Sequence, residues 1–131
     1  MSEKVVSAVY VDNDLYLSRM VACLCERCGG VRVTPLNSSA EVLLWLSRNS
    51  CDAIVCSYKM LGISDLDLLD ILRKRGNKIP IIIFDISGQE TPMRNETISF
   101  NPAFFGSILR GDRPRAQIPE LVDMIIKAAS T

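Results

Sequence analysis

The sequence predicts an α/β protein in which helices cover both faces of a doubly wound, five-stranded parallel sheet. Short apolar runs rich in β-branched and aromatic residues recur along the chain, and segments with helical spacing separate them. These runs are apolar at almost every position, which is typical of parallel strands that are buried on both faces. Because each right-handed crossover returns the chain beside its starting strand, the alternation predicts a sheet between two helical layers. The expected strands are residues 5–11, 31–35, 53–56, 79–84 and 103–108.

Capping residues define the first two helices between these strands. Asp14 is placed to cap the first helix, and Gly29 and Gly30 can end it, since glycine readily adopts the left-handed backbone that closes many helices. The second helix is expected to begin at Ser38, and Glu41 follows three residues later, which is the spacing of a capping box. In that motif each of the two side chains satisfies an unpaired backbone donor.

The second half of the chain carries two further helical patterns and one irregular segment. A third helix is expected from near Asp65 to the basic residues 73–75, which complement the negative end of its dipole. The last helix follows Pro114 and carries apolar residues at helical spacing. Between them, residues 86–101 lack the apolar stripe of a fourth helix, so that helix is predicted to be short, distorted or partly loop.

Length and charge limit the domain count and the kinds of partner. A chain of 131 residues with 48% hydrophobic residues fits one domain, 1–131. Lys plus Arg and Asp plus Glu number 15 each, so the balance argues against a nucleic-acid or membrane surface and favours a protein partner or small ligand. The sequence shows neither a signal-peptide pattern nor an apolar run of membrane-spanning length, and therefore predicts a cytoplasmic protein.

The five cysteines form a poor disulfide framework, because their number is odd and the core is apolar enough to stand without them. Reduced and mostly buried thiols are therefore predicted. Cys23, Cys25 and Cys28 lie within one helical pattern that points them in different directions, and the chain has no histidine to complete a tetrahedral site, so zinc is not expected. Cys56 is expected in the core, whereas Trp45 could either pack internally or anchor a partner.

Polar residues follow three of the predicted strands at the edge where ligands of open parallel sheets bind. Asp12, Asn13 and Asp14 follow the apolar part of the first strand, Ser57 follows the third, and Asp85 follows the fourth. Because the carboxyl ends of parallel strands meet at one edge, these residues define the candidate site.

These segments resemble the receiver domain of two-component response regulators, the CheY-like family. The resemblance extends to residues 59–62, Lys-Met-Leu-Gly, and to residues 79–84, Ile-Pro-Ile-Ile-Ile-Phe, and so spans nearly the whole chain. It implies a flavodoxin-like fold with the strand order 2-1-3-4-5. In that family an acidic pair after the first strand and an Asp after the third hold a divalent cation, and the latter Asp accepts a phosphoryl group.

Three positions of the family's reaction site differ in this chain. Asn13 replaces the second acid of the pair, and a neutral amide is a poorer ligand for a hard cation than a carboxylate. Ser57 replaces the phosphoryl-accepting Asp, and a hydroxyl without a neighbouring base is a poor nucleophile. Asp85 replaces the responding Ser or Thr, and its charge would repel a phosphoryl anion. No cofactor is expected, and Asp12 and Asp14 are only weak candidates for binding magnesium.

The family's Lys after the fifth strand has two candidate counterparts. Counting from Phe105 places Ile108 there, whereas counting back from Pro114 places Arg110. The sequence leaves both open. An Arg reaching toward Asp12 and Asp85 would act as a fixed cation in place of the metal and the Lys.

The resemblance therefore implies a non-enzymatic receiver-like module of phosphorelay signalling whose phosphorylation pocket is degenerate. Its expected partner is a protein, either a histidine kinase or an output protein. The family also implies a candidate homodimer through the face of the fourth helix, fifth strand and fifth helix.

Two alternatives remain. One is an active receiver in which Asp12, Asp14 or Asp85 acts as a surrogate acceptor. The other is a small hydrolase or nucleotide-binding domain on the same fold. The absence of histidine, of a glycine-rich phosphate loop and of a Gly-x-Ser-x-Gly elbow argues against the second.

Overall fold

A computed structural model of the chain describes residues 5–12, 14–56, 72, 74–85, 104–109 and 117–130. For residues 83, 85 and 104–109 it describes the backbone only. The expected third helix, apart from its last residues, and the irregular segment 86–101 lie outside the described residues.

The five described strands form one parallel sheet in the order β2-β1-β3-β4-β5. Both the predicted order and the predicted strands are confirmed, with bounds that differ by at most two residues from those expected. The strands are β1 (Val6–Val11), β2 (Val31–Leu36), β3 (Ala53–Cys56), β4 (Ile81–Asp85) and β5 (Phe104–Leu109).

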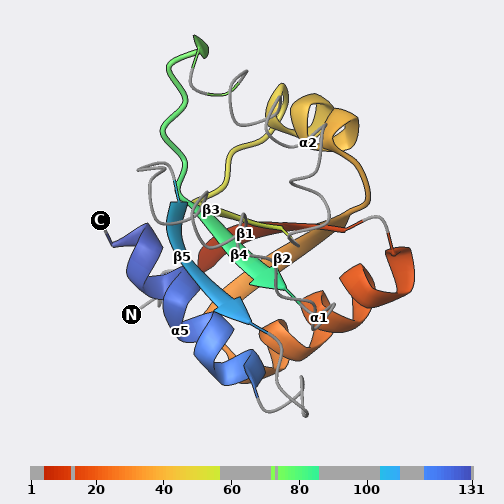
Figure 1. Cartoon of the computed structure of the whole chain (residues 1–131), viewed down its shortest axis with the longest axis vertical. Helices are drawn as coiled ribbons and strands as arrows, with labels where there is room; N and C mark the ends of the chain where they lie inside the picture. The colour runs from red at the N-terminus through yellow and green to blue at the C-terminus, as the bar shows by residue number, and fades with distance from the viewer. Residues whose placement is uncertain are drawn as a thin grey trace.

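Helices lie on both sides of the sheet, as predicted. Helices α1 (Leu15–Cys28) and α5 (Ile118–Ala129) cover one face, and α2 (Ser39–Leu46) lies over the other (Figure 1). Each face has its own core. The α1 and α5 side is filled by residues such as Tyr10, Phe84 and Leu121, and the α2 side by residues such as Val9, Val42 and Ile54.

The caps form where the sequence placed them. The Asp14 carboxylate accepts a hydrogen bond from the Leu17 N–H at 3.2 Å, and α1 ends at Gly29 with a φ of 85°. The Ser38 hydroxyl accepts from the Glu41 N–H at 3.1 Å and starts α2. These bonds satisfy backbone donors that the first turn of a helix leaves unpaired. The Asp14 cap starts α1 directly after the carboxyl end of β1, and the Ser38 cap starts α2 soon after the end of β2.

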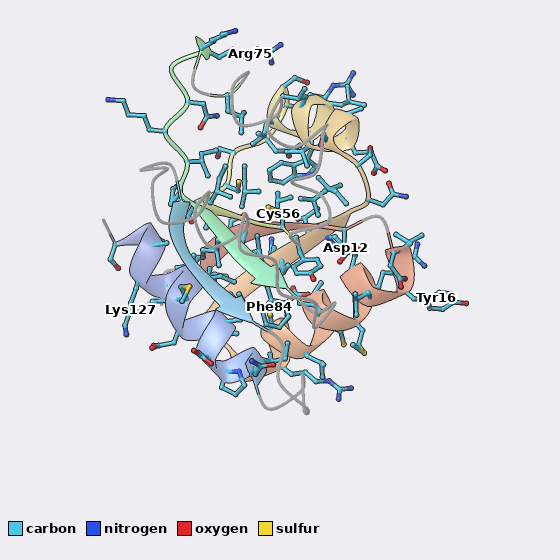
Figure 2. The ribbon with its side chains drawn as sticks, viewed as in Figure 1. Asp12, Tyr16, Cys56, Arg75, Phe84 and Lys127 are labelled. Atoms are coloured by element: carbon cyan, nitrogen blue, oxygen red, sulfur yellow. The ribbon has the colours of Figure 1, made fainter. Side chains whose placement is uncertain are left out.

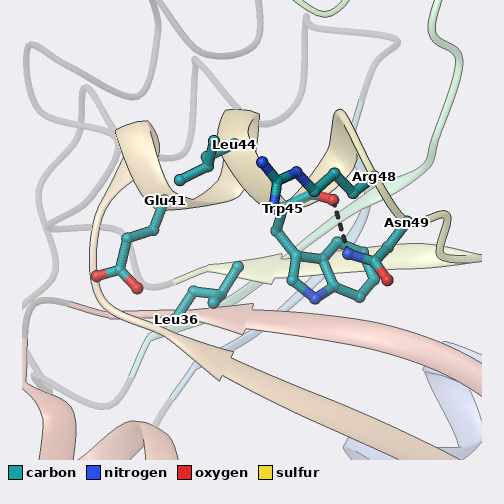
Figure 3. A pocket seen from close by; sticks show the side chains of 6 residues that line it. All are labelled: Leu36, Glu41, Leu44, Trp45, Arg48 and Asn49. Atoms are coloured by element: carbon teal, nitrogen blue, oxygen red, sulfur yellow. Dashed lines mark hydrogen bonds between the residues drawn. The ribbon is translucent and has the colours of Figure 1, made fainter.

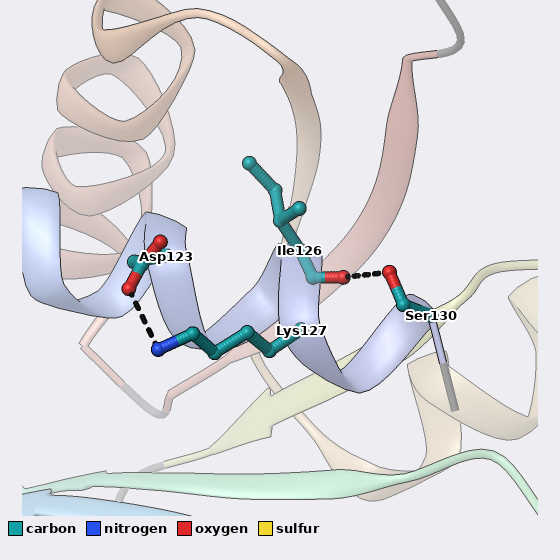
Figure 4. A network of polar contacts seen from close by, with 4 residues as sticks. All are labelled: Asp123, Ile126, Lys127 and Ser130. Atoms are coloured by element: carbon teal, nitrogen blue, oxygen red, sulfur yellow. Dashed lines mark hydrogen bonds and ion pairs between the residues drawn. The ribbon is translucent and has the colours of Figure 1, made fainter.

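Helix α5 shows a clear division between its two faces. Ile118, Leu121, Val122 and Ile125 are buried, as their spacing predicts. On the outer face, Lys127 and Asp123 form an ion pair at 3.1 Å, and the Ser130 hydroxyl donates to the Ile126 carbonyl (Figure 4). Because both charged side chains are well exposed, this pair adds little stability.

The pairing of β4 with β5 contains a bulge. Ile81 pairs with Phe104 but Ile82 pairs with Gly106, so that Phe105 is an extra residue in β5. A bulge inserts one residue and shifts every later pairing by one position. The bulge pairs Asp85 with Leu109, and the choice between Ile108 and Arg110 stays open.

Candidate functional site

The strand register places the ends of β1, β3 and β4 at the carboxyl edge of the sheet, where the candidate site was predicted. Val11 pairs with Cys56, so Asp12 and Ser57 are the next residues after one paired position. On the other side of β3, the end of β4 pairs with β5, and Asp85 lies level with Leu109. The edge expected from the sequence is thus formed by the backbone of the three strands β1, β3 and β4.

Asp12 is the best described residue of this edge, and it is buried, with only 4% of its surface exposed. One carboxylate oxygen, Oδ1, accepts a hydrogen bond from the Asp14 N–H at 3.0 Å. A charged carboxylate is costly to bury unless hydrogen bonds or opposite charges compensate it. The local turn therefore orients Asp12 and supplies part of that compensation.

Ser18 supports the same turn from α1, although the sequence reasoning did not single it out. Its hydroxyl is fully buried and lies within hydrogen-bonding distance of the carbonyl oxygens of Asp12 at 3.3 Å, Asp14 at 3.1 Å and Leu36 at 3.4 Å. A hydroxyl has one proton, so it can donate fully to one of these at a time. A signal was present in the sequence, because Ser18 is a polar residue at the helical phase of the buried Val21 and Cys25.

Tyr10 lies two residues before Asp12 and is also fully buried. Its ring packs edge-to-face against Phe84, with centroids 6.4 Å apart. Burial raises the pKa of the Tyr10 phenol, and the Asp12 carboxylate raises it further. The Asp12 carboxylate also acts on the phenol through a side-chain contact with its hydroxyl, although among the described residues no partner meets the geometry of a regular hydrogen bond. A neutral phenol and a carboxylate therefore lie near each other beneath the candidate site.

The remaining residues predicted for the pocket are only partly described. Asn13, Ser57 and Arg110 lie outside the described residues, and for Asp85 and Ile108 the structure gives the backbone alone. Ile108 lies within β5, level with Phe84, and Arg110 is the first residue after the strand ends.

Asp14, the second weak candidate for magnesium, is exposed and caps α1. Within the described ranges, no group of three acidic, cysteine or histidine side chains could hold a metal ion. Asn13 and Ser57, which neighbour Asp12 in the predicted pocket, lie outside these ranges.

All five cysteines are free thiols. Cys56 is buried, as predicted, and burial raises the pKa of the Cys25 thiol to about 12. The prediction that the thiols are mostly buried is wrong for Cys23 and Cys28, which are exposed. Cys23 faces away from the stripe of α1 that contains Val21 and Cys25, so helical phase decides its exposure. Cys28 lies close to that stripe in phase but is the last residue of the helix, where the packing against the sheet ends.

The start of α1 presents apolar surface close to this edge. Tyr16 is 90% exposed and extends away from the molecule (Figure 2).

No helix in the described part of the chain combines the length and apolarity needed to cross a membrane.

No protein-family model matches the sequence, and no curated protein matches it. Solved structures do match over almost the whole chain. The receiver domain of the Francisella response regulator 1452 has a TM-score of 0.74 at 21% identity, covering 95% of this chain and 97% of its own. The response regulator domain of Thermotoga maritima CheB has a TM-score of 0.76 at 15% identity, covering 97% and 98%. The receiver domain of the putative response regulator NarL from Mycobacterium tuberculosis has a TM-score of 0.75 at 17% identity, covering 97% and 98%.

These similarities define the class of fold. The chain has the CheY-like, flavodoxin-type fold of response regulator receiver domains, as the sequence predicted. At sequence identities of 15% to 21%, the similarity establishes the fold alone. The function depends on the residues at the carboxyl edge of the sheet.

Proposed function

We propose that this chain is a receiver-like module of two-component signalling that acts by protein contact and is not phosphorylated by the usual Asp chemistry. The single observation that carries the proposal is the residue after β3. The register places the end of β3 beside the end of β1, where Asp12 is buried, and the residue that follows in the sequence is Ser57. A phosphoryl-accepting carboxylate is therefore missing at the position where the fold would present it.

The chemistry of the other edge residues supports this proposal. Asn13 supplies a neutral amide where a hard cation prefers a carboxylate. Asp85 ends β4 and would add negative charge where a phosphoryl anion has to be accommodated. A serine hydroxyl needs a base to become a nucleophile, and the chain has no histidine to serve as one.

We further propose that Arg110 takes the place of the divalent cation. Asp12 is a buried carboxylate, and Asp85 ends a strand at the same edge of the sheet. Two carboxylates near each other require a proton or a cation. Arg110 directly follows β5, whereas Ile108 pairs within the strand. A guanidinium can pair with carboxylates through several donors at once.

The proposed role requires a partner. In the proposal this is a histidine kinase or an output protein, and the module itself is cytoplasmic and has no enzymatic activity. The face of the fourth helix, fifth strand and fifth helix is proposed as one dimer surface. Of that face the structure describes α5 and the backbone of β5.

Incubation of the full chain with acetyl phosphate and magnesium tests the proposal, with intact-mass spectrometry as the readout. We expect no phosphoryl adduct on the parent. The matched comparison is the double variant Asn13→Asp, Ser57→Asp, which restores the family's carboxylates and should recover weak magnesium binding.

An acid-labile adduct on the parent, mapped to Asp12, Asp14 or Asp85, would support the surrogate-acceptor alternative and overturn the proposal. Turnover of acetyl phosphate by the parent, measured as released phosphate above the uncatalysed rate, would instead point to the hydrolase alternative.

A further inference from the structure

An open groove runs between α2 and the end of β2, away from the carboxyl-edge site. Its volume is about 250 Å³. The lining residues, shown in Figure 3, are Leu36, Glu41, Leu44, Trp45, Arg48 and Asn49. The Asn49 side-chain amide donates to the Trp45 carbonyl at 3.0 Å and so fixes the end of α2 at one end of the groove.

Three of these residues, Glu41, Leu44 and Trp45, form one stripe along α2, and Arg48 continues it in the turn that follows the helix. Leu44, Trp45 and Arg48 follow Glu41 at spacings of three, four and seven residues, which place side chains on the same helical face. Trp45 is half-buried and packs partly against the core on the α2 side of the sheet, whereas Leu44 is 65% exposed. The stripe thus combines an anchored aromatic ring with an apolar side chain that α2 leaves in solvent.

The two ends of the stripe carry opposite charges. Glu41 lies at one end of the groove, and Arg48 follows seven residues later, with its side chain extending back over Trp45 in Figure 3. Within the described part of the chain, neither side chain forms an ion pair. Both are exposed. The groove therefore has an acidic end and an apolar centre that is bordered by an exposed guanidinium.

We propose that this stripe, comprising Glu41, Leu44, Trp45 and Arg48, binds the same stripe of a second copy of the chain through a two-fold axis. The midpoint of the stripe lies between Leu44 and Trp45. Two antiparallel copies of α2 related by a two-fold axis at that point place Glu41 opposite Arg48 of the second copy, twice. They also place Leu44 opposite Trp45 of the second copy, again twice. A two-fold interface requires such self-complementarity, in which residue i meets j and j meets i.

The shape of the surface fits the same occupant. The exposed Leu44 of one copy needs an apolar cavity, and the groove beside Trp45 and Leu36 provides one on the other copy. Aromatic residues that line a central pocket contribute most to interface affinity, and charges at the rim mainly fix orientation. This inference does not depend on the proposed function.

Sedimentation of the full chain over a range of concentrations tests the inference. The parent should form a dimer, and Glu41→Lys or Arg48→Glu should raise its dissociation constant by about tenfold, because each change replaces two attractions with two repulsions. The double change Glu41→Lys, Arg48→Glu should restore the dimer, since the exchanged charges are again complementary. The matched control is Glu26→Lys, an equal change on the exposed face of α1, and should leave the dimer unchanged.

The only tryptophan of the chain, Trp45, reports directly on this face. Dilution of the parent should shift its emission to longer wavelength as the indole becomes hydrated. Leu44→Ser, at an exposed position that folding does not require, should give the shifted spectrum at all concentrations. Far-UV circular dichroism verifies that each variant remains folded.

A parent that stays monomeric at about millimolar concentration would overturn the inference. So would folded Glu41→Lys and Arg48→Glu variants whose sedimentation and Trp45 emission both match those of the parent, since association would then use only another face, such as the one that includes β5 and α5. Loss of the dimer in both single variants without recovery in the double variant would contradict the two-fold pairing. The groove would then fit a different protein.

Discussion

The carboxyl edge of the sheet and the α2 groove differ in how the molecule accommodates their charged groups. At the edge, Asp12 is buried and its carboxylate already accepts a hydrogen bond from the Asp14 N–H. In the groove, Glu41 and Arg48 are exposed and border an apolar cavity. The comparison indicates that hydrogen bonds within the chain help to compensate the buried charge at the edge. The exposed charges and apolar cavity of the groove are instead free to contact another molecule. The predictions below test this difference, beginning with the largest expected effect.

The core beneath the edge should be far more sensitive to truncation than the groove. Phe84→Ala should lower the free energy of unfolding by about 3 to 5 kcal/mol, because it removes a fully buried ring that packs edge-to-face on Tyr10. Leu44→Ala, at a position 65% exposed, should change it by no more than about 0.5 kcal/mol. Urea denaturation of both variants at a concentration that favours the monomer measures the difference. Equal losses would remove the distinction between the two regions.

We expect a cationic side chain of the same chain to neutralise the negative charge of the carboxylates at the carboxyl edge. Arg110→Ala should lower the free energy of unfolding by about 1 to 3 kcal/mol at neutral pH, since it leaves buried Asp12 without its proposed partner. Addition of Asp85→Thr should reduce that loss, because it removes the second carboxylate. Arg32→Ala, which removes an exposed Arg on β2, is the control. A single variant as stable as the parent would contradict the role of Arg110.

Alkaline pH should weaken the core on the α1 and α5 side of the sheet. Burial raises the pKa of the Cys25 thiol from 9.0 to about 12, so both folded and unfolded chains keep this proton below pH 9. Between these values only the unfolded chain loses it, and stability should fall as pH rises. The raised pKa of Tyr10 acts in the same direction. Denaturation at about pH 8 and about pH 10.5 should show a smaller decline in Cys25→Ala than in the parent. An equal decline would mean that Cys25 does not contribute.

Most of the fold could be predicted because local signals and the global arrangement agree. The Asp14 cap, the Ser38 cap and the apolar stripe of α5 each appear in the sequence at the position where the structure has them. The buried strands could be predicted equally well from the sequence, because parallel strands that are covered on both faces are apolar throughout. Exposure within α1 was harder to predict, because Cys23 has apolar neighbours but faces away from the buried stripe, and Cys28 lies at the last residue of the helix.

The candidate site was less predictable, because it depends on how separate strands align. The bulge at Phe105 shifts the end of β5 by one residue, and no count along the sequence reveals such a shift. The groove beside α2 arises where the β2 end and the helix meet, so Leu36 and Trp45 could not be paired from their sequence positions. Trp45 packs on the core, which is one of the two roles considered for it, and it also lines a surface groove, while its role as a partner anchor stays a prediction.

The central claim is that this receiver-type fold no longer has the chemistry for phosphoryl transfer. Calorimetric titration with magnesium tests it most directly, with the parent compared to the double variant Asn13→Asp, Ser57→Asp. The parent should bind magnesium more weakly than about millimolar, because two carboxylate positions hold an amide and a hydroxyl, and the double variant should bind measurably tighter. Submillimolar affinity in the parent, abolished by Asp12→Asn, would contradict the claim.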